Sequence, residues 1–289
     1  MASWRTDLAL EQHRGMGGKL PGVVCEEGQR QGLPLTTVRV TTAEGARALG
    51  KPEGVYHTLD LAAVTRREEG AMGRAVAVLR GLLAPLLPEK GEVLVVGLGN
   101  RAITPDAVGP KTCDHLLVTR HLVGMIPEHF GQFRSVSALA AGVMASTGVE
   151  SGELALAVVE RLRPAAVIAV DALCARQVER LCATVQVGDT GISPGSGVGN
   201  HRFSLNRETL GVPVIALGVP TVVEGATLCA DLLAQAGVEK PEDLPGGGLL
   251  VTPKDIDQRV EDMGRLLGRA VSLALQPGLT EEELEALVG

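Results

Sequence analysis

Aromatic residues are nearly absent from this chain of 289 residues. They make up 2% of the sequence, with one Trp and one Tyr, whereas hydrophobic residues as a class make up 45%. The core must therefore be built from Leu, Val, Ile and Ala, and it can be sizeable without disulfides. Proteins that bind single-stranded nucleic acid stack its bases on aromatic side chains, so the shortage of aromatics disfavours that function.

Excess positive charge is also missing. The formal net charge is −7 and the sequence pI is about 5.5. A nucleic-acid-binding domain typically presents a basic patch to the phosphate backbone, and nothing in this composition indicates one. We expect no nucleic-acid partner, while basic or neutral peptides remain compatible with an acidic surface.

Cysteine pairs, long apolar runs and metal-ligand spacings are lacking as well. The five cysteines include no Cys-x-x-Cys pair, which fits a reducing cytoplasm better than a disulfide framework. No run of about 18 uninterrupted apolar residues indicates a membrane span, and no apolar segment near the N-terminus indicates a signal peptide. The six histidines include no His-x-x-x-His or His-Glu-x-x-His pair, so we expect no metal and no other cofactor.

What the sequence does contain is an alternation of apolar runs with segments of helical spacing. This alternation predicts an α/β fold with a mostly parallel, doubly wound sheet flanked by helices. Residues 1–34 show weak periodicity and predict an irregular arm. The predicted strands are 35–41, 57–61, 92–98, 135–141, 165–171, 184–188, 212–218 and 248–252. The predicted helices are 42–50, 65–87, 107–123, 152–163, 173–182, 224–236 and 255–275, with a short terminal helix from residue 280.

Two carboxylates, Asp106 and Asp171, follow two of the apolar runs. Asp106 comes shortly after residues 92–98, and Asp171 ends residues 165–171. In an open α/β sheet, ligands and chemistry collect at the carboxyl ends of the strands. Two acids brought together there could share a proton and activate a water molecule, which makes acid-protease chemistry the first hypothesis. The alternative is structural, with Asp106 in a helix start beside Pro105 and Asp171 holding a loop.

Two glycine-rich segments follow predicted strands. Residues 97–102 match the dinucleotide fingerprint G-x-G-x-x-A, but four further residues delay the helix that should open at once, which favours a tight turn. The second segment begins with Asp189-Thr190-Gly191, the triplet of pepsin-like proteases, whose folds are all-β. It continues to residue 200 and is compatible with an anion-binding nest, an active-site loop or a plain surface loop.

These segments resemble the spore germination endopeptidases, with which endospore-forming bacteria degrade small acid-soluble spore proteins. The resemblance extends from about residue 5 to residue 275. The matching segments are 5–9, 97–100, 104–110, 169–173, 189–200, 209–216 and 218–223. It implies an atypical aspartic endopeptidase, unrelated in fold to pepsin, whose sheet is similar to that of the hydrogenase-maturation endopeptidases. By motif, it implies that Asp106 and Asp171 are catalytic. The residues of the possible active-site loop are Asn100, Asp189, Thr190, Gly191, Ser196 and Gly197.

The resemblance also implies a zymogen, a homotetramer and a location in the cytoplasm of the forespore or spore core. Its propeptide would be residues 1–7, followed by one protease domain over 8–289 with an elaboration at 8–90 and a core at 91–277. Cleavage is expected between Asp7 and Leu8, since that family cuts after an acidic residue and before a hydrophobic one. An arm without apolar periodicity is expected to be mobile enough to reach an active site.

Two other functions remain open from the residues alone. One is a metal-assisted endopeptidase like the hydrogenase-maturation enzymes, in which acids at these strand ends contact a metal in the substrate. The other is a nucleotide-binding oxidoreductase that uses Gly97 and Gly99.

Overall fold

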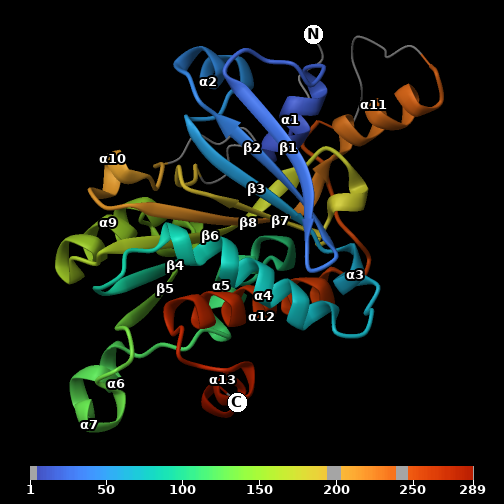
Figure 1. The fold of residues 1–289 in the computed structure, drawn as a ribbon. Coiled ribbons are helices and arrows are strands. Elements are labelled where there is room, and N and C mark those ends of the chain that lie inside the picture. Colours follow the sequence, from blue (N-terminus) through green and yellow to red (C-terminus); the bar gives the residue numbers. More distant parts are fainter. Residues whose placement is uncertain (1–4, 194–202, 239–246, 289) are drawn as a thin grey trace.

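A large sheet covered by helices organises the chain. The computed structural model describes residues 5–193, 203–238 and 247–288, and within these ranges nine strands form one sheet in the order β1-β2-β3-β7-β8-β6-β4-β5, with β9 paired to β8 (Figure 1). The strands are β1 (Val23–Arg30), β2 (Leu33–Val40), β3 (Gly54–Asp60), β4 (Val93–Leu98), β5 (Val136–Gly142), β6 (Ala166–Ala175), β7 (Thr184–Gly188), β8 (Val214–Glu224) and β9 (Leu250–Val251).

Helices connect most of these strands. The α-helices are α1 (Ala9–Gly15), α2 (Ala43–Leu49), α3 (Ala62–Thr65), α4 (Ala71–Leu83), α5 (Val108–Asp114), α6 (Arg120–Met125), α7 (Pro127–Phe130), α8 (Met144–Thr147), α9 (Ser151–Leu162), α10 (Arg207–Leu210), α11 (Gly225–Gln235), α12 (Ile256–Leu275) and α13 (Glu281–Val288). Three short 3-10 turns are η1 (Ala84–Leu86), η2 (Thr104–Asp106) and η3 (Val178–Arg180). None of the described helices combines the length and apolar character needed to span a bilayer.

The predicted α/β class, a large sheet flanked by helices, is confirmed. Parallel pairing, however, is confined to β5, β4, β6 and β8. The other pairs, from β1 across to β8 and between β8 and β9, are antiparallel. The sheet is therefore mixed rather than mostly parallel, because the N-terminal strands arrive as a meander that joins the core at β7.

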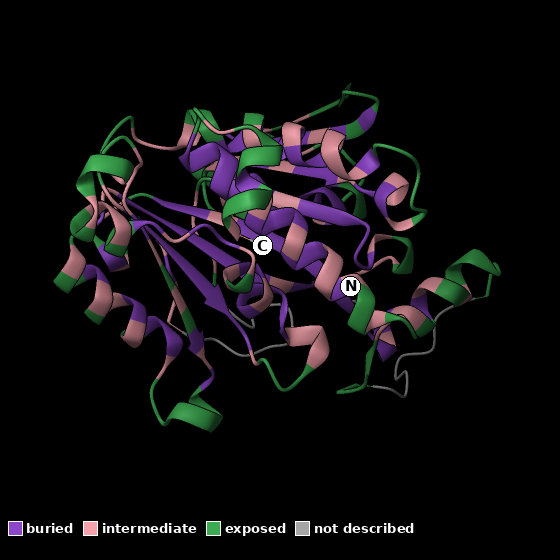
Figure 2. Cartoon of the chain, turned by 90° about the horizontal axis from the view of Figure 1, so that it is seen from below, coloured by how far each residue is buried: buried purple, intermediate pink, exposed green. Residues whose placement is uncertain are grey.

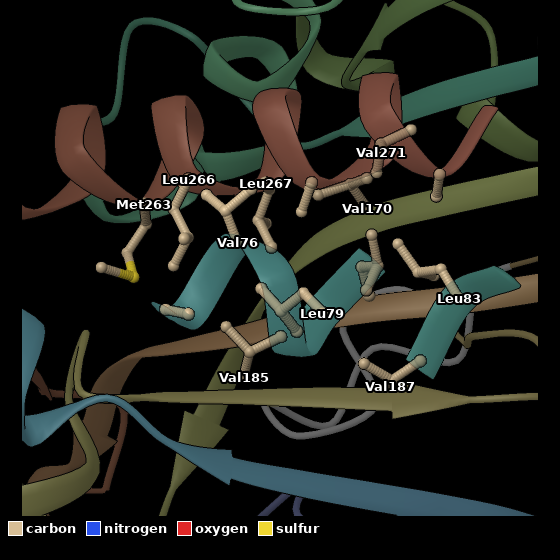
Figure 3. Packing of buried hydrophobic residues seen from close by; sticks show 14 of the residues in the cluster. Val76, Leu79, Leu83, Val170, Val185, Val187, Met263, Leu266, Leu267 and Val271 are labelled. Carbon is tan, nitrogen blue, oxygen red and sulfur yellow. The ribbon is translucent and has the colours of Figure 1, made fainter. Parts of the chain in front are cut away.

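Alternate residues of the central strands enter two cores on opposite faces of the sheet. Ile168 and Val170 of β6 belong to the core beneath α4 and α12, whereas Val167 and Ala169 belong to the core beneath α9. Figure 3 shows side chains of α4 between those of α12 and β7. Figure 2 shows the same layers: the buried residues are concentrated in the strands and on the helix faces that pack against the sheet. This continuous burial explains why the central strands have near-continuous apolar sequences.

The N-terminal region is ordered, and the prediction of an irregular arm over residues 1–34 was wrong from residue 5 onward. It contains α1 and the hairpin of β1 and β2, closed by Gln31 and Gly32 with φ of 48° and 76°. Two consecutive positive φ values are typical of the two-residue turn that matches strand twist. β1 escaped detection because it is an edge strand with mostly exposed residues and therefore no apolar alternation.

Three predicted helices also differ from the structure. Residues 173–182 are not a helix, because β6 continues to Ala175 beside β8 and is followed only by η3. The segment 107–123 divides into α5 and α6, and the helix predicted from residue 65 begins after Gly70, which has a φ of 66°. β8 extends through Pro220 to Glu224, six residues beyond the predicted end at 218.

Candidate active site

Asp106 and Asp171 line one cavity of about 500 Å³. It lies at the carboxyl end of the parallel strands, where β4 and β6 part after the last pair, Gly97 and Val170. Asp171 is the next residue of β6, and Asp106 ends η2 in the loop that follows β4. The structure therefore brings the two predicted acids to the same cavity, as the strand-end argument expects.

The loop after β4 folds closely over Gly99 and so positions Asp106. The Oδ2 atom of Asp106 accepts a hydrogen bond from the backbone N–H of Asn100, at 2.8 Å. Gly99 has a φ of 107°, and a Cβ added there would lie 2.0 Å from the carbonyl oxygen of Asp106. Glycine is thus required for packing within the loop, which accounts for the fingerprint-like sequence without a nucleotide.

Asp171 is more deeply buried than Asp106. Its residue is 5% exposed, and its Oδ1 accepts a hydrogen bond from the N–H of Ala172, at 2.9 Å. On β8 its neighbour is Gly218, which is paired in turn with Gln186 of β7. A Cβ at Gly218 would lie 2.3 Å from Leu173, so the small residue leaves room for that side chain. Ala216 and Gly188 line the cavity nearby, and together these small residues keep the space above the sheet open.

The N-terminal region supplies another wall of the cavity through Lys51 and Tyr56. The Tyr56 hydroxyl donates to the carbonyl of Pro52 and accepts from Thr190. Burial raises the pKa of Tyr56 to about 12, so its phenol stays protonated at neutral pH. Burial lowers the pKa of the Lys51 ammonium, and the carboxylate of Asp7 acts in the opposite direction. The segment from α2 to β3 thus contributes directly to the cavity.

Residues 5–9 are firmly held, and Asp7 among them lines this cavity. Asp7, which lines it, donates its N–H to the carbonyl of Cys174, and its Oδ2 accepts from the Cys174 N–H, both at 2.8 Å. The amide of Gln186 donates to the Asp7 carbonyl and accepts from the N–H of Ala9. Leu8 is fully buried against Leu173 and its neighbours. The expectation of a mobile arm was therefore wrong for these residues.

The predicted active-site loop is only partly at the cavity. Thr190 and Gly191 line it, together with Ile192 and Ser193. Asp189 instead pairs with β3, where its Oδ1 accepts from the N–H of Val55 at 2.8 Å. Asn100 contributes its backbone N–H to Asp106, while its side chain accepts from Ala102. Ser196 and Gly197 lie outside the described residues.

Two buried thiols, Cys174 at the cavity and Cys113 in α5, are held in unreactive forms. Burial raises the pKa of the Cys174 thiol to about 12 and that of Cys113 to about 11, so both remain protonated at neutral pH. Nucleophilic cysteines instead have lowered pKa values. Across 5–193, 203–238 and 247–288, no three His, Cys, Asp or Glu side chains gather in a way that could hold a metal ion.

Sequence reasoning missed Asp7, Lys51 and Gln186 as residues of the cavity. Asp7 was expected as a cleavage site, not as part of the cavity wall. Lys51 follows Gly50, the left-handed C-cap of α2, and had no motif around it. Gln186 sits in the apolar run of β7, where a single polar residue that faces the cavity was the available signal.

Comparison with known proteins places the chain in a family. The family model described as germination protease matches residues 6–236. The chain is 40% identical to the germination protease of Caldanaerobacter subterraneus subsp. tengcongensis and to that of Clostridium perfringens, in both cases over 98% of each chain. It is 35% identical to that of Priestia megaterium, over 98% of this chain and 96% of the relative. The chain belongs to the germination protease family, and its class is therefore that of a peptidase.

Solved structures match as well. A NiFe hydrogenase maturation protease, HycI, from Thermococcus kodakarensis is 16% identical, with a TM-score of 0.37. The match covers 66% of this chain and 98% of that one.

Proposed function

We propose that the chain is an endopeptidase that hydrolyses small acid-soluble spore proteins during germination, with Asp106 and Asp171 as its catalytic pair. One observation supports this most directly: Asp171 in β6 and Asp106 in the loop after the neighbouring parallel strand β4 line one cavity. Membership of the germination protease family supports the reaction class and the biological setting.

In the proposed mechanism, one of the two carboxyl groups is ionised and takes a proton from a water molecule. The other is protonated and donates a hydrogen bond to the carbonyl of the scissile peptide. Two neighbouring carboxyl groups tend to hold one proton between them because their charges repel, which prepares both roles at once. The water attacks the carbonyl carbon, and the proton passes to the leaving nitrogen as the C–N bond breaks. The scheme requires no metal and no other cofactor.

The course of residues 5–9 supports the binding of an extended peptide in this cavity. Beyond Val170, β6 has no pairing with β4, and the backbone of Cys174 exchanges hydrogen bonds with Asp7 on that side. Gln186 contacts the main chain on both sides of Leu8. Addition of a peptide along a strand edge gives affinity through main-chain groups, while pockets select the side chains.

Regulation by the N-terminal segment belongs to the same proposal. Residues 1–7 would be a propeptide, removed by cleavage between Asp7 and Leu8. The position of Asp7 on the cavity wall supports this, because the bond to be cut lies beside the cavity. The burial of Leu8 implies that the segment must first shift locally before it can be cut. The proposed assembly is a homotetramer, and the proposed location is the spore core.

The test is the cleavage of a purified small acid-soluble spore protein by the full-length chain. Asp106→Asn and Asp171→Asn should each reduce kcat by about a hundredfold or more, because either change removes the acid or the base. Asp257→Asn, an exposed change in α12, is the control and should retain full activity. Circular dichroism should show that all three variants are folded. Full activity in either folded cavity variant would exclude the pair as the catalytic groups.

A further inference from the structure

A glutamine side chain at the cavity bridges the main chain on either side of Leu8. The Nε2 atom of Gln186 donates to the carbonyl oxygen of Asp7 at 3.3 Å, and its Oε1 atom accepts from the N–H of Ala9 at 2.8 Å. An amide nitrogen only donates and an amide oxygen only accepts, so the two contacts fix the orientation of the side chain. Both partners are main-chain groups, which every extended peptide presents.

The carbonyl that Gln186 contacts belongs to the bond that the proposed processing would break. The peptide bond between Asp7 and Leu8 joins the Asp7 carbonyl to the Leu8 nitrogen, and the oxygen of this carbonyl is the acceptor. During hydrolysis, the attack of water on the carbonyl carbon moves the π electrons of the C=O bond onto that oxygen. A donor that already lies beside the oxygen stabilises this charge as it develops.

The register of three strands places Gln186 opposite Asp171. Gln186 of β7 is paired with Gly218 of β8, and Gly218 is paired with Asp171 of β6. The side chains of Gln186 and Asp171 both line the cavity, and the two strand spacings place their Cα atoms about 10 Å apart. Gly218 adds no side chain between them. One bound peptide can therefore contact Asp171 on one side and Gln186 on the other.

From this arrangement, we propose that Gln186 is a third catalytic residue, which holds the carbonyl of the scissile bond and stabilises the charge on its oxygen. The proposal rests on the proposed function and deepens it. The acid pair moves the protons, and Gln186 forms and breaks no covalent bond. As the C–N bond breaks, the electrons on the oxygen re-form C=O. The nitrogen leaves with the electron pair of the C–N bond and a proton from the acid pair.

The first test measures cleavage of a small acid-soluble spore protein by a full-length chain with Gln186→Met. Methionine preserves the length of the side chain and removes both hydrogen bonds. The value of kcat should fall about a hundredfold or more, the usual loss when one donor to the oxyanion is removed. KM should rise less than about tenfold, because the donor acts mainly in the transition state. A residue that only anchors the N-terminal segment would leave kcat unchanged.

A second substitution separates the two contacts of the amide. Gln186→Glu keeps an oxygen for the main-chain N–H and loses the donor to the carbonyl. We expect kcat to fall as in Gln186→Met, with KM closer to its native value. Gln29→Met, at an exposed glutamine of β1, is the matched control and should retain the native kcat and KM. Circular dichroism should show that all of these variants are folded.

A folded Gln186→Met chain with the native kcat would overturn the proposal, as would a loss confined to KM. Hydrogen exchange of the Ala9 amide, followed by NMR, measures the contact without any cleavage. In an Asp171→Asn chain, which leaves the segment uncut, Gln186→Met should accelerate this exchange about tenfold, the scale for loss of one hydrogen bond. Unchanged exchange would reject the contact. Faster exchange in a chain whose native form cuts no spore protein would support the contact and reject the proposed peptidase function.

Discussion

At the scale of single residues, Gly99 allows the loop after β4 to fold closely enough to hold Asp106 in place. Gly99→Ala places a methyl group 2.0 Å from the Asp106 carbonyl and forces a side chain into a φ of 107°. The strained backbone alone should cost about 1–3 kcal/mol of unfolding free energy. Displacement of Asp106 should lower kcat up to about a hundredfold, since small misplacements of reacting groups are costly.

The matched control is Gly81→Ala in α4. A Cβ there meets no atom within 4 Å, and the position is exposed. Alanine in an exposed helix should stabilise the chain by about 0.5–1 kcal/mol. Urea unfolding monitored by circular dichroism and a cleavage assay measure both effects. A Gly99→Ala chain as stable and active as the control would show that the loop does not need glycine.

Asp189 provides a second prediction at this scale. Because its carboxylate accepts the Val55 N–H, Asp189→Asn keeps an acceptor oxygen and should leave most of the cleavage activity. Asp189→Ala removes the acceptor of this exposed hydrogen bond and should cost about 0.5–1.5 kcal/mol of unfolding free energy. If Asp189→Asn abolished cleavage in a folded chain, the Asp-Thr-Gly triplet would have to take a place in the mechanism.

The sequence predicted some site residues and missed others for a physical reason. Asp106 and Asp171 could be predicted because strand ends in α/β sheets converge, a rule that needs only local patterns. Lys51 and Tyr56 reach the cavity through the pairing of β3 with β7, which joins residues more than a hundred positions apart. No local pattern encodes such a pairing, so these residues could not be found from sequence.

At the scale of elements, Glu11 of α1 joins the N-terminal segment to the end of β6. Its carboxylate accepts the N–H groups of Arg176 and Gln177 and forms an ion pair with Arg180 at 3.3 Å. It is 4% exposed. Glu11→Ala leaves these donors without their shared acceptor and should cost about 3–5 kcal/mol, the scale for loss of one partner in a buried ion pair.

The comparison is Glu27→Ala, which removes an exposed ion pair between Glu27 and Arg14 and should cost at most about 1 kcal/mol. Guanidinium unfolding curves of the two variants measure the difference. Similar losses in both would mean that α1 is not anchored through Glu11.

The predictability of the elements depended on burial. The central strands were predicted because both of their faces are buried and their sequences are apolar throughout. β1 was missed because most of its residues are exposed. The continuation of β6 to Ala175 was missed because residues 173–182 are compatible with helical spacing, whereas pairing with β8 keeps residues 173–175 extended. Pairing with a neighbour thus overrode local preference.

At the scale of the whole molecule, the proposed mechanism predicts resistance to chelation. The described residues contain no three-membered group of His, Cys, Asp or Glu suited to a metal ion. Activity on a small acid-soluble spore protein should therefore be unchanged after exhaustive dialysis against EDTA. Loss of activity that added nickel or zinc restores would favour metal-assisted hydrolysis instead.

Processing of the N-terminus is a second prediction for the whole molecule. After incubation of the full-length chain at mildly acidic pH, mass spectrometry should detect a new terminus at Leu8. Asp106→Asn should keep the original terminus, because the cut depends on the chain's own cavity. Full protease activity in a chain that keeps residues 1–7 would rule out the segment as a regulatory element.

The attachment of Asp7 to its own cavity has a kinetic consequence. A ligand tethered by a few residues is present at an effective concentration on the order of millimolar, whatever the amount of protein. A free substrate at micromolar concentration therefore competes at a disadvantage of about a thousandfold. In the proposed processing, hydrolysis of one peptide bond would turn the tethered competitor into a dilute fragment, and dilution would make the change practically irreversible. Each chain would thus be activated only once, at a time set by a single intramolecular cleavage.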